Sequence, residues 1–102
     1  MEIAAANIVR SNARRDKGKL FAVLRVEGDY LLLADGGTRK VEKPKRKKSR
    51  HVLFVAAEDG RLSEKIRGEE KITNSELRRA LAAFREEDYP DQEGDNTWQD
   101  PT

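Results

Sequence analysis

Apolar residues alternate with other residues through the first half of the chain, in the pattern of short β-strands. The clearest example runs from Lys19 to Gly28. One face of this segment carries Leu20, Ala22, Leu24 and Val26, and the other carries Phe21, Val23 and Arg25. Neighbouring side chains of a strand point to opposite faces. Because the first face is apolar without a break, we expect it to point into the core.

Four other segments have the composition of strands, and turn residues separate them. They are Asn7–Ser11, Tyr30–Asp35, Thr38–Lys43 and His51–Ala57. The glycine pair after Asp35 supplies the positive φ that a hairpin turn needs. Pro44 lacks a backbone donor and is expected to end the pairing or to sit at an edge. Five short strands predict a mainly β domain, a small closed or nearly closed five-stranded barrel over residues 1–57.

Helical periodicity replaces strand alternation after residue 57. Residues 59–70 predict a single helical turn that carries Leu62 and Ile66 on one side and stops at Gly68. Residues 88–102 are acidic and rich in turn residues, which is typical of a disordered tail. The predicted organisation is a barrel at 1–57, a helical C-terminal extension at 58–87 and a disordered acidic tail at 88–102.

A longer helix is predicted from residue 73 onward. Thr73 and Glu76 have the spacing of a capping box, with Ile72 and Leu77 at the staple positions outside and inside the cap. One helix face then carries an apolar stripe made of Leu77, Ala80, Leu81 and Phe84. The helix should end near Asp88. With about 12–14 residues it is too short to be stable alone in water, so we expect it to dock on the sheet.

The composition adds limits to this picture. Of 102 residues, 39% are charged and 36% are hydrophobic, which fits one small domain with a modest core. The absence of cysteine excludes disulfides and thiolate metal ligands. No apolar run approaches the length of a membrane span, and the N-terminus lacks the basic and apolar regions of a signal peptide. We therefore expect a soluble cytoplasmic protein with no membrane partner.

Residues that carry catalysis or hold metal ions are scarce. His51 is the only histidine, so a zinc ion would need carboxylates for nearly all of its ligands. None of the serines lies in a nucleophile-elbow sequence, and only His51 could act as their base. Glycine loops that cradle nucleotide phosphates are absent as well. We expect a protein that is not an enzyme and that uses no metal ion or cofactor.

Charge is distributed unevenly, and this is the strongest chemical signal. Residues 1–56 hold fourteen Lys and Arg against six Asp and Glu, whereas residues 57–102 hold seven against thirteen. Seven of the cations fall within Lys40–Val52. Clustered cations release condensed counterions when they bind phosphates, which favours a nucleic acid as partner. One alternative is a solvated basic loop. Another is binding to an anionic membrane surface, but no amphipathic segment or lipidation motif accompanies the basic run to support it.

Residues Asn7–Val26, NIVRSNARRDKGKLFAVLRV, resemble the KOW motif of certain large-subunit ribosomal proteins of archaea and eukaryotes. That motif is a strand, a loop with a key glycine and a second strand. Gly18 matches the glycine, and the stretch from Arg15 to Lys19 matches the loop. The likeness continues through Asp29–Val55, where such domains also place a basic stretch before the last strand. The resemblance implies an SH3-like barrel of KOW type that binds RNA.

Charge and resemblance together predict non-catalytic RNA binding, to ribosomal RNA or to the translation machinery. The residues expected to contact RNA are Arg10, Arg14, Arg15, Lys17, Gly18, Lys19, Arg39, Lys43, Lys45, Arg46, Lys47, Lys48, Arg50 and His51. Gly18 would allow close backbone approach to a phosphate, and Asp16 would orient a neighbouring arginine or cap the loop. Because KOW domains also bind proteins, the alternative is an interaction module that docks on a transcription or translation complex. We expect a monomer when the protein is free.

Overall fold

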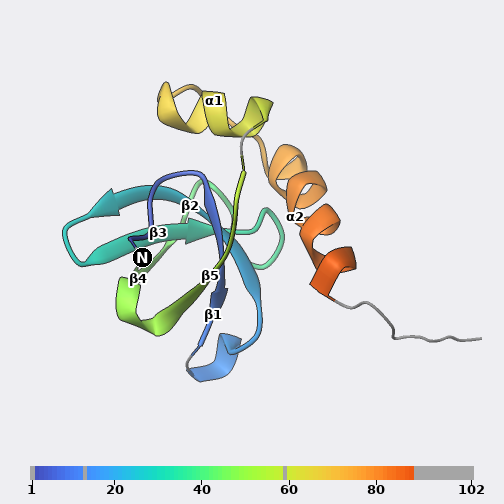
Figure 1. The fold of residues 1–102 in the computed structure, drawn as a ribbon. Helices are drawn as coiled ribbons and strands as arrows, with labels where there is room; N and C mark the ends of the chain where they lie inside the picture. Colours follow the sequence, from blue (N-terminus) through green and yellow to red (C-terminus); the bar gives the residue numbers. More distant parts are fainter. Residues whose placement is uncertain (1, 13, 59, 89–102) are drawn as a thin grey trace, which may run out of the picture.

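Five antiparallel strands form a single sheet, and two helices lie against one of its faces (Figure 1). This computed structural model describes residues 2–12, 14–58 and 60–88. The strands are β1 (Asn7–Ser11), β2 (Leu20–Glu27), β3 (Tyr30–Ala34), β4 (Lys45–Lys48) and β5 (Val52–Ala57). The other elements are the helices α1 (Arg61–Arg67) and α2 (Asn74–Asp88) and the 3-10 turns η1 (Arg14–Asp16) and η2 (Ser49–His51). None of these helices is long and apolar enough to cross a membrane.

The strands are ordered β4-β3-β2-β1-β5, so β4 and β5 form the two edges of the sheet. Strand β5 returns to lie beside β1, the first strand of the chain. Among the described residues no ladder joins β4 to β5, so the expected closure into a barrel is not confirmed. The turn η2 connects the two edges and is held by two backbone hydrogen bonds of 2.8 Å. The Ser49 amide donates to the Asp29 carbonyl, and the Asn12 amide donates to the His51 carbonyl.

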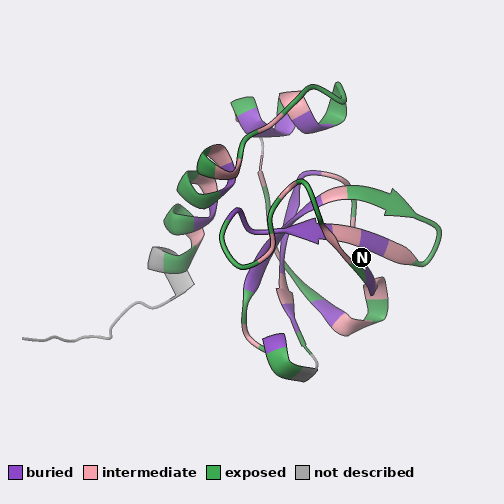
Figure 2. Cartoon of the chain, turned by 180° about the vertical axis from the view of Figure 1, so that it is seen from behind, coloured by how far each residue is buried: buried purple, intermediate pink, exposed green. Residues whose placement is uncertain are grey.

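Both faces of β2 are buried over its first four residues, Leu20–Val23, which alternation alone did not predict (Figure 2). The cluster between the sheet and the helices contains Ala6, Ile8, Leu20, Ala22, Ala34, Leu62, Ile66, Leu77 and Leu81. The cluster on the other face contains Val9, Phe21, Val23, Leu31, Leu33 and Val52. Only the face that carries Leu20 was expected to point into the core, but Phe21 and Val23 on the other face are buried as well. The expected burial of Val26 was wrong, because the β2–β3 register shifts between Val23 and Arg25 and the end of β2 leaves the core, so that Val26 is 41% exposed.

The segment between β3 and β4 also differs from the prediction. No strand forms at Thr38–Lys43, because Asp35 holds this segment as a loop through hydrogen bonds from three of the next four residues. Such local bonds compete with a sheet ladder. The fourth strand begins only after Pro44, so β4 occupies a stretch that we expected to be a loop. A basic run without apolar alternation thus becomes a strand by pairing with β3.

Helix α2 begins and ends where the sequence predicts. The backbone amide of Thr73 donates to Glu76 Oε1 at 2.9 Å, and the amide of Glu76 donates to Thr73 Oγ1 at 3.1 Å, which confirms the capping box. Leu77 and Leu81 are fully buried against the sheet. The shorter helix α1 stops at Gly68, as predicted. Beyond Asp88, the predicted acidic tail lies outside the described residues.

Candidate nucleic-acid interface

A buried carboxylate organises the loop between β1 and β2. Asp16, at the end of η1, is 7% exposed and accepts a hydrogen bond from Ser11 Oγ at 2.8 Å. It also forms ion pairs with two cations of β4, Lys45 Nζ at 2.7 Å and Lys47 Nζ at 2.9 Å. Burial by itself raises the pKa of Asp16, but the hydrogen bonds from Lys45, Lys47 and Ser11 outweigh it. They hold this pKa well below its ordinary value of 3.8.

These contacts correct two expectations. Of the two roles expected of Asp16, orienting a neighbouring arginine or capping the loop, the first is replaced by contacts with lysines from β4. Lys47 is 6% exposed and its ammonium lies on Asp16, so it is not available for the predicted contact with RNA. Lys45 is half-buried and shares the same carboxylate. The cluster of Ser11, Asp16, Lys45 and Lys47 therefore ties the first loop to the β4 edge of the sheet.

The turn that follows η1 has the open backbone expected of it. Gly18 adopts a φ of 89°, a left-handed conformation that favours glycine. Its amide donates to the Ser11 carbonyl at 2.8 Å, and its carbonyl accepts from Arg10 Nη1 at 3.0 Å. Nothing lies within 4 Å of the position that a Cβ would occupy, so the backbone can be approached closely here. Lys17 and Lys19 are exposed on either side of it.

The loop after β3 brings another cation to the same region. Asp35 Oδ1 accepts hydrogen bonds from the amides of Gly37 and Arg39 at 2.8 and 2.7 Å, and Asp35 Oδ2 accepts from Thr38 Oγ1 at 2.8 Å. Burial raises the pKa of Asp35, but these hydrogen bonds and the charge of Arg85 lower it overall. The carboxylate therefore stays ionised and fixes the backbone that carries Arg39.

Together these elements surround a hollow of about 220 Å³, which we call the basic hollow. It is lined by Arg15, Asp16, Lys19, Phe21, Thr38, Arg39 and Lys45. Among these described lining residues the one anion is Asp16, which is already paired with lysines. Within the described part of the chain, the side chains of Arg15, Lys19 and Arg39 form no ion pair. The hollow therefore presents uncompensated positive charge on a concave surface.

Comparison with known proteins adds no family. A scan of protein-family models finds no match to this chain, and a search of curated proteins finds no similar sequence. Within residues 2–12, 14–58 and 60–88, no group of three or more His, Asp or Glu could hold a metal ion. The functional interpretation therefore depends on the geometry of the chain itself.

Because side chains alternate along β4, Arg46 and Lys48 lie on a different surface of the sheet from Lys45 and Lys47. Arg46 and Lys48 pair beside Leu32 and Tyr30, whereas the lysines bound to Asp16 alternate with them. The Arg46 guanidinium lies 3.8 Å from the centre of the Tyr30 ring, and Lys48 Nζ lies 5.8 Å from it, both as cation–π contacts. Arg46 also approaches Glu27 Oε1 at 3.9 Å, a weak contact because both side chains are exposed.

The remaining predicted residues lie outside the basic hollow. Arg14 begins η1, and Lys43 is exposed in the segment before β4. Arg50 is in η2 and borders a different hollow. His51 is half-buried, and its carbonyl accepts a hydrogen bond from the Asn12 amide, so its backbone has a structural role. Of the fourteen predicted residues, the structure thus brings Arg15, Lys19, Arg39 and Lys45 together around the basic hollow, and the other ten do not line it.

Sequence reasoning missed two contributors to the basic hollow. Thr38 lines it without carrying a charge, and Asp35 positions its neighbours although it does not line the hollow itself. The available signal was the sequence Asp-Gly-Gly-Thr, because aspartate often accepts hydrogen bonds from backbone two residues later in turns. Phe21 also lines the hollow but is only 2% exposed, so its ring packs in the core and is not available for base stacking.

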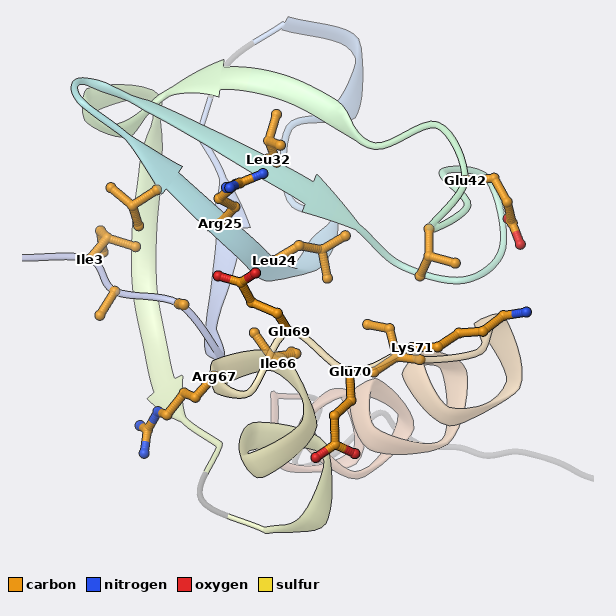
Figure 3. Close-up of a pocket in the computed structure, with 15 residues that line it drawn as sticks. Ile3, Leu24, Arg25, Leu32, Glu42, Ile66, Arg67, Glu69, Glu70 and Lys71 are labelled. Atoms are coloured by element: carbon orange, nitrogen blue, oxygen red, sulfur yellow. The ribbon is translucent and has the colours of Figure 1, made fainter.

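A larger hollow has different chemistry (Figure 3). It has a volume of about 890 Å³ and lies between the N-terminal segment, β2, β3 and the region that joins α1 to α2. Its apolar lining includes Ile3, Leu24, Leu32, Val41, Ile66 and Ile72. The charged residues around it have both signs, as Arg25, Glu69, Glu70 and Lys71 show. Size alone would select this hollow, but its mixed charge does not favour a polyanion.

Proposed function

We propose that this chain is a non-catalytic RNA-binding protein whose basic hollow binds the phosphate backbone of ribosomal RNA or of another RNA of the cytoplasmic translation machinery. One observation carries the proposal. Arg15, Lys19 and Arg39 come from two loops that are distant in sequence, and they converge on one concave surface, where no carboxylate of the described residues pairs with them. Lys45 adds to the positive charge, although it shares Asp16 with a second lysine.

Phosphate is the chemical group that such a surface fits best. A concave surface lined by one sign of charge concentrates the electric field and attracts a polyanion. The guanidinium groups of Arg15 and Arg39 can each donate two parallel hydrogen bonds to phosphate oxygens, and Lys19 supplies a compact charge. Phe21 is too deeply buried to stack on a base. Phosphate contacts alone carry little sequence information, so recognition would depend on the shape of the RNA.

The same proposal includes a fold assignment, an SH3-like domain of KOW type over residues 1–57. Three features support it. Strands β1 and β2 flank a loop that ends in Gly18 with a φ of 89°. Strand β5 returns to pair with β1. The short turn η2 connects β4 to β5 and thereby brings the two edges of the sheet toward each other.

Salt-dependent binding tests the role of the basic hollow. Binding of the full chain to large-subunit rRNA fragments and to an unrelated duplex would be followed by fluorescence anisotropy across a salt series. The test variant is Arg15→Ala/Lys19→Ala/Arg39→Ala. The control is Arg61→Ala/Lys71→Ala/Arg79→Ala, which removes the same charges from exposed positions on and between the helices. Because each neutralised phosphate contributes roughly 0.7–0.9 to the log–log salt slope, we expect the slope to fall by about 2–3 in the test variant alone.

Each other outcome has a definite meaning. Equal losses in the two variants would show that net charge attracts RNA diffusely, which contradicts binding in the hollow. Equal binding to rRNA fragments and to the unrelated duplex would remove the ribosomal assignment and keep RNA binding. If the unsubstituted chain binds no RNA at low salt, the proposal fails, and a protein-interaction module that docks on a transcription or translation complex takes its place. Circular dichroism of both variants would verify that they fold.

A further inference from the structure

The two edges of the sheet differ in their protection against pairing with another strand. A sheet edge exposes unpaired backbone donors and acceptors, and proteins commonly block such edges with lysine, proline or other charges. Strand β4 is blocked in this way, since all four of its residues are Lys or Arg and Pro44 precedes it. Strand β5 has the sequence VLFVAA, without a charge or a proline. Among the described residues it pairs only with β1, so its other edge has no strand beside it.

Exposed apolar surface gathers beside this unprotected edge. The exposed large hydrophobic residues of the described chain are Val26, Leu53 and Phe54, at 41%, 51% and 38%. All three line one hollow of about 600 Å³, together with Ile3. Apolar residues that are scattered singly over a surface need no explanation, but a contiguous group indicates a contact surface. An apolar group beside a bare strand edge fits a protein strand and does not fit RNA.

Charges at the ends of β5 indicate which protein strand fits. Arg50 precedes the strand, and Glu58 follows it. When two copies of β5 run antiparallel, the basic end of each lies beside the acidic end of the other, and opposite charges across strands are favourable. A parallel arrangement would place like charges together. Phe54 is equally distant in sequence from Arg50 and Glu58, so a two-fold axis at Phe54 brings these charges together twice.

In place of the monomer expected from the sequence, we propose that two copies of this chain associate through antiparallel pairing of their β5 strands about a two-fold axis at Phe54. The contact uses the same strand from each copy, as a two-fold interface requires. It joins two five-stranded sheets into one continuous sheet and satisfies the backbone groups at both β5 edges. At the axis the two Phe54 rings are neighbours across the strands, an arrangement in which aromatic pairs are stabilising. None of the residues that line the basic hollow belongs to β5.

The oligomeric state of the full chain is the first test. Sedimentation over a wide range of protein concentration should show a monomer–dimer equilibrium. Leu53→Lys places a charge on the edge strand and should abolish the dimer. Ala82→Lys adds the same charge at an exposed position of α2 and should leave the dimer intact. Glu58 is unsuitable for substitution, because its Oε1 also accepts the amides of Gly60 and Ser63 at the start of α1.

Cysteine cross-linking tests the axis separately from overall affinity. The chain has no cysteine, so Phe54→Cys introduces a single thiol at the proposed axis. Directly opposite Cα atoms of antiparallel strands lie about 4.5–5.5 Å apart, within the range that a disulfide spans. Oxidation should form a covalent dimer roughly tenfold or more faster than in Lys17→Cys, a control on an exposed loop, because pairing raises the effective thiol concentration.

Three results would overturn the proposal. One is a full chain that remains monomeric at every concentration. Another is a dimer that Leu53→Lys does not weaken more than Ala82→Lys. The third is equal cross-linking at positions 54 and 17, which would place the axis away from Phe54. If Leu53→Lys fails to fold by circular dichroism, the cross-linking rates of Phe54→Cys and Lys17→Cys still decide between support and rejection.

Discussion

Substitution of Asp16 by asparagine removes one negative charge from a site where it balances two lysines. Asp16 is buried, and its oxygens lie 2.7 and 2.9 Å from the ammonium groups of Lys45 and Lys47. Lys45 is partly exposed and can turn toward water, so its loss of a partner has a small effect. Lys47 is buried and would keep an uncompensated charge. Breaking a buried ion pair in this way destabilises a protein by about 3–5 kcal/mol, and we expect Asp16→Asn to do so.

Removing the lysine instead should have a smaller effect. In Lys47→Met, Asp16 retains Lys45 and the Ser11 hydroxyl, so no buried charge is left alone. The loss is then one charge-assisted hydrogen bond, about 1.5–3 kcal/mol. In the double variant the orphaned ammonium is absent as well. The losses of unfolding free energy in the two single variants should therefore add up to more than the loss in the double variant Asp16→Asn/Lys47→Met, by about 0.5–3 kcal/mol.

Urea unfolding followed by far-ultraviolet circular dichroism measures these free energies. Lys17→Met is the control, because Lys17 is an exposed lysine next to Asp16 and should change stability by less than about 0.5 kcal/mol. The folded-state pKa of Asp16 lies below its ordinary value of 3.8, so the unfolded chain takes up the proton first. The contribution of Asp16 to the free energy of unfolding is thus complete above this ordinary pKa and is lost as the pH falls below it. An Asp16→Asn effect below about 1 kcal/mol, or simple additivity with Lys47→Met, would refute the reasoning.

Two further predictions concern the contact between α2 and the loop after β3, and the start of α2. Gly36 has a φ of 80°, and a Cβ there would lie 2.3 Å from the Asn74 carbonyl oxygen, so Gly36→Ala should destabilise the fold by more than Gly28→Ala. Gly28 has a similarly positive φ of 61° and open space around it, so Gly28→Ala measures the backbone strain alone, about 1–3 kcal/mol. Equal urea midpoints for Gly36→Ala and Gly28→Ala would contradict the predicted clash. Thr73→Ala should cost about 1 kcal/mol in urea unfolding through loss of the cap. Ser75→Ala, at an exposed position two residues later in the first turn, should be nearly neutral, and equal effects would contradict the capping role.

The parts of the fold that depend on local interactions were predictable from the sequence. The capping box of α2 involves residues three apart, and α1 ends at Gly68 as its glycine signal predicts. The left-handed conformation at this helix end, however, belongs to Glu69, with a φ of 57°. The fourth strand was not predictable in this way. Lys45–Lys48 has no apolar alternation and becomes a strand through its ladder with β3. In the loop before it, the backbone amides of Gly37 and Arg39 bind the side chain of Asp35 in place of the strand pairing that we expected.

The positive charge of the candidate site was predictable from the sequence, but the residues that line it were not. Counting charges identified the basic half of the chain, and both loops of the basic hollow lie within it. Charge counting could not show that Lys47 is held by a carboxylate 31 residues earlier in the chain. Nor could it show that β4 points alternate cations to different surfaces, with Arg46 over Tyr30. Which cations remain free for a ligand depends on tertiary pairing, and this information is not local.

Separation of the two proposed surfaces has a consequence for RNA binding. The basic hollow is lined by residues of η1, β2, the loop after β3 and β4, and the proposed contact between copies uses β5 at the other edge of the sheet. The cations of β4 oppose pairing with another strand, whereas the uncharged β5 offers no partner to a phosphate backbone. Each edge thus excludes the partner of the other. A dimer would carry two basic hollows, and an RNA long enough to reach both would bind more tightly than one hollow allows, because the second contact is intramolecular.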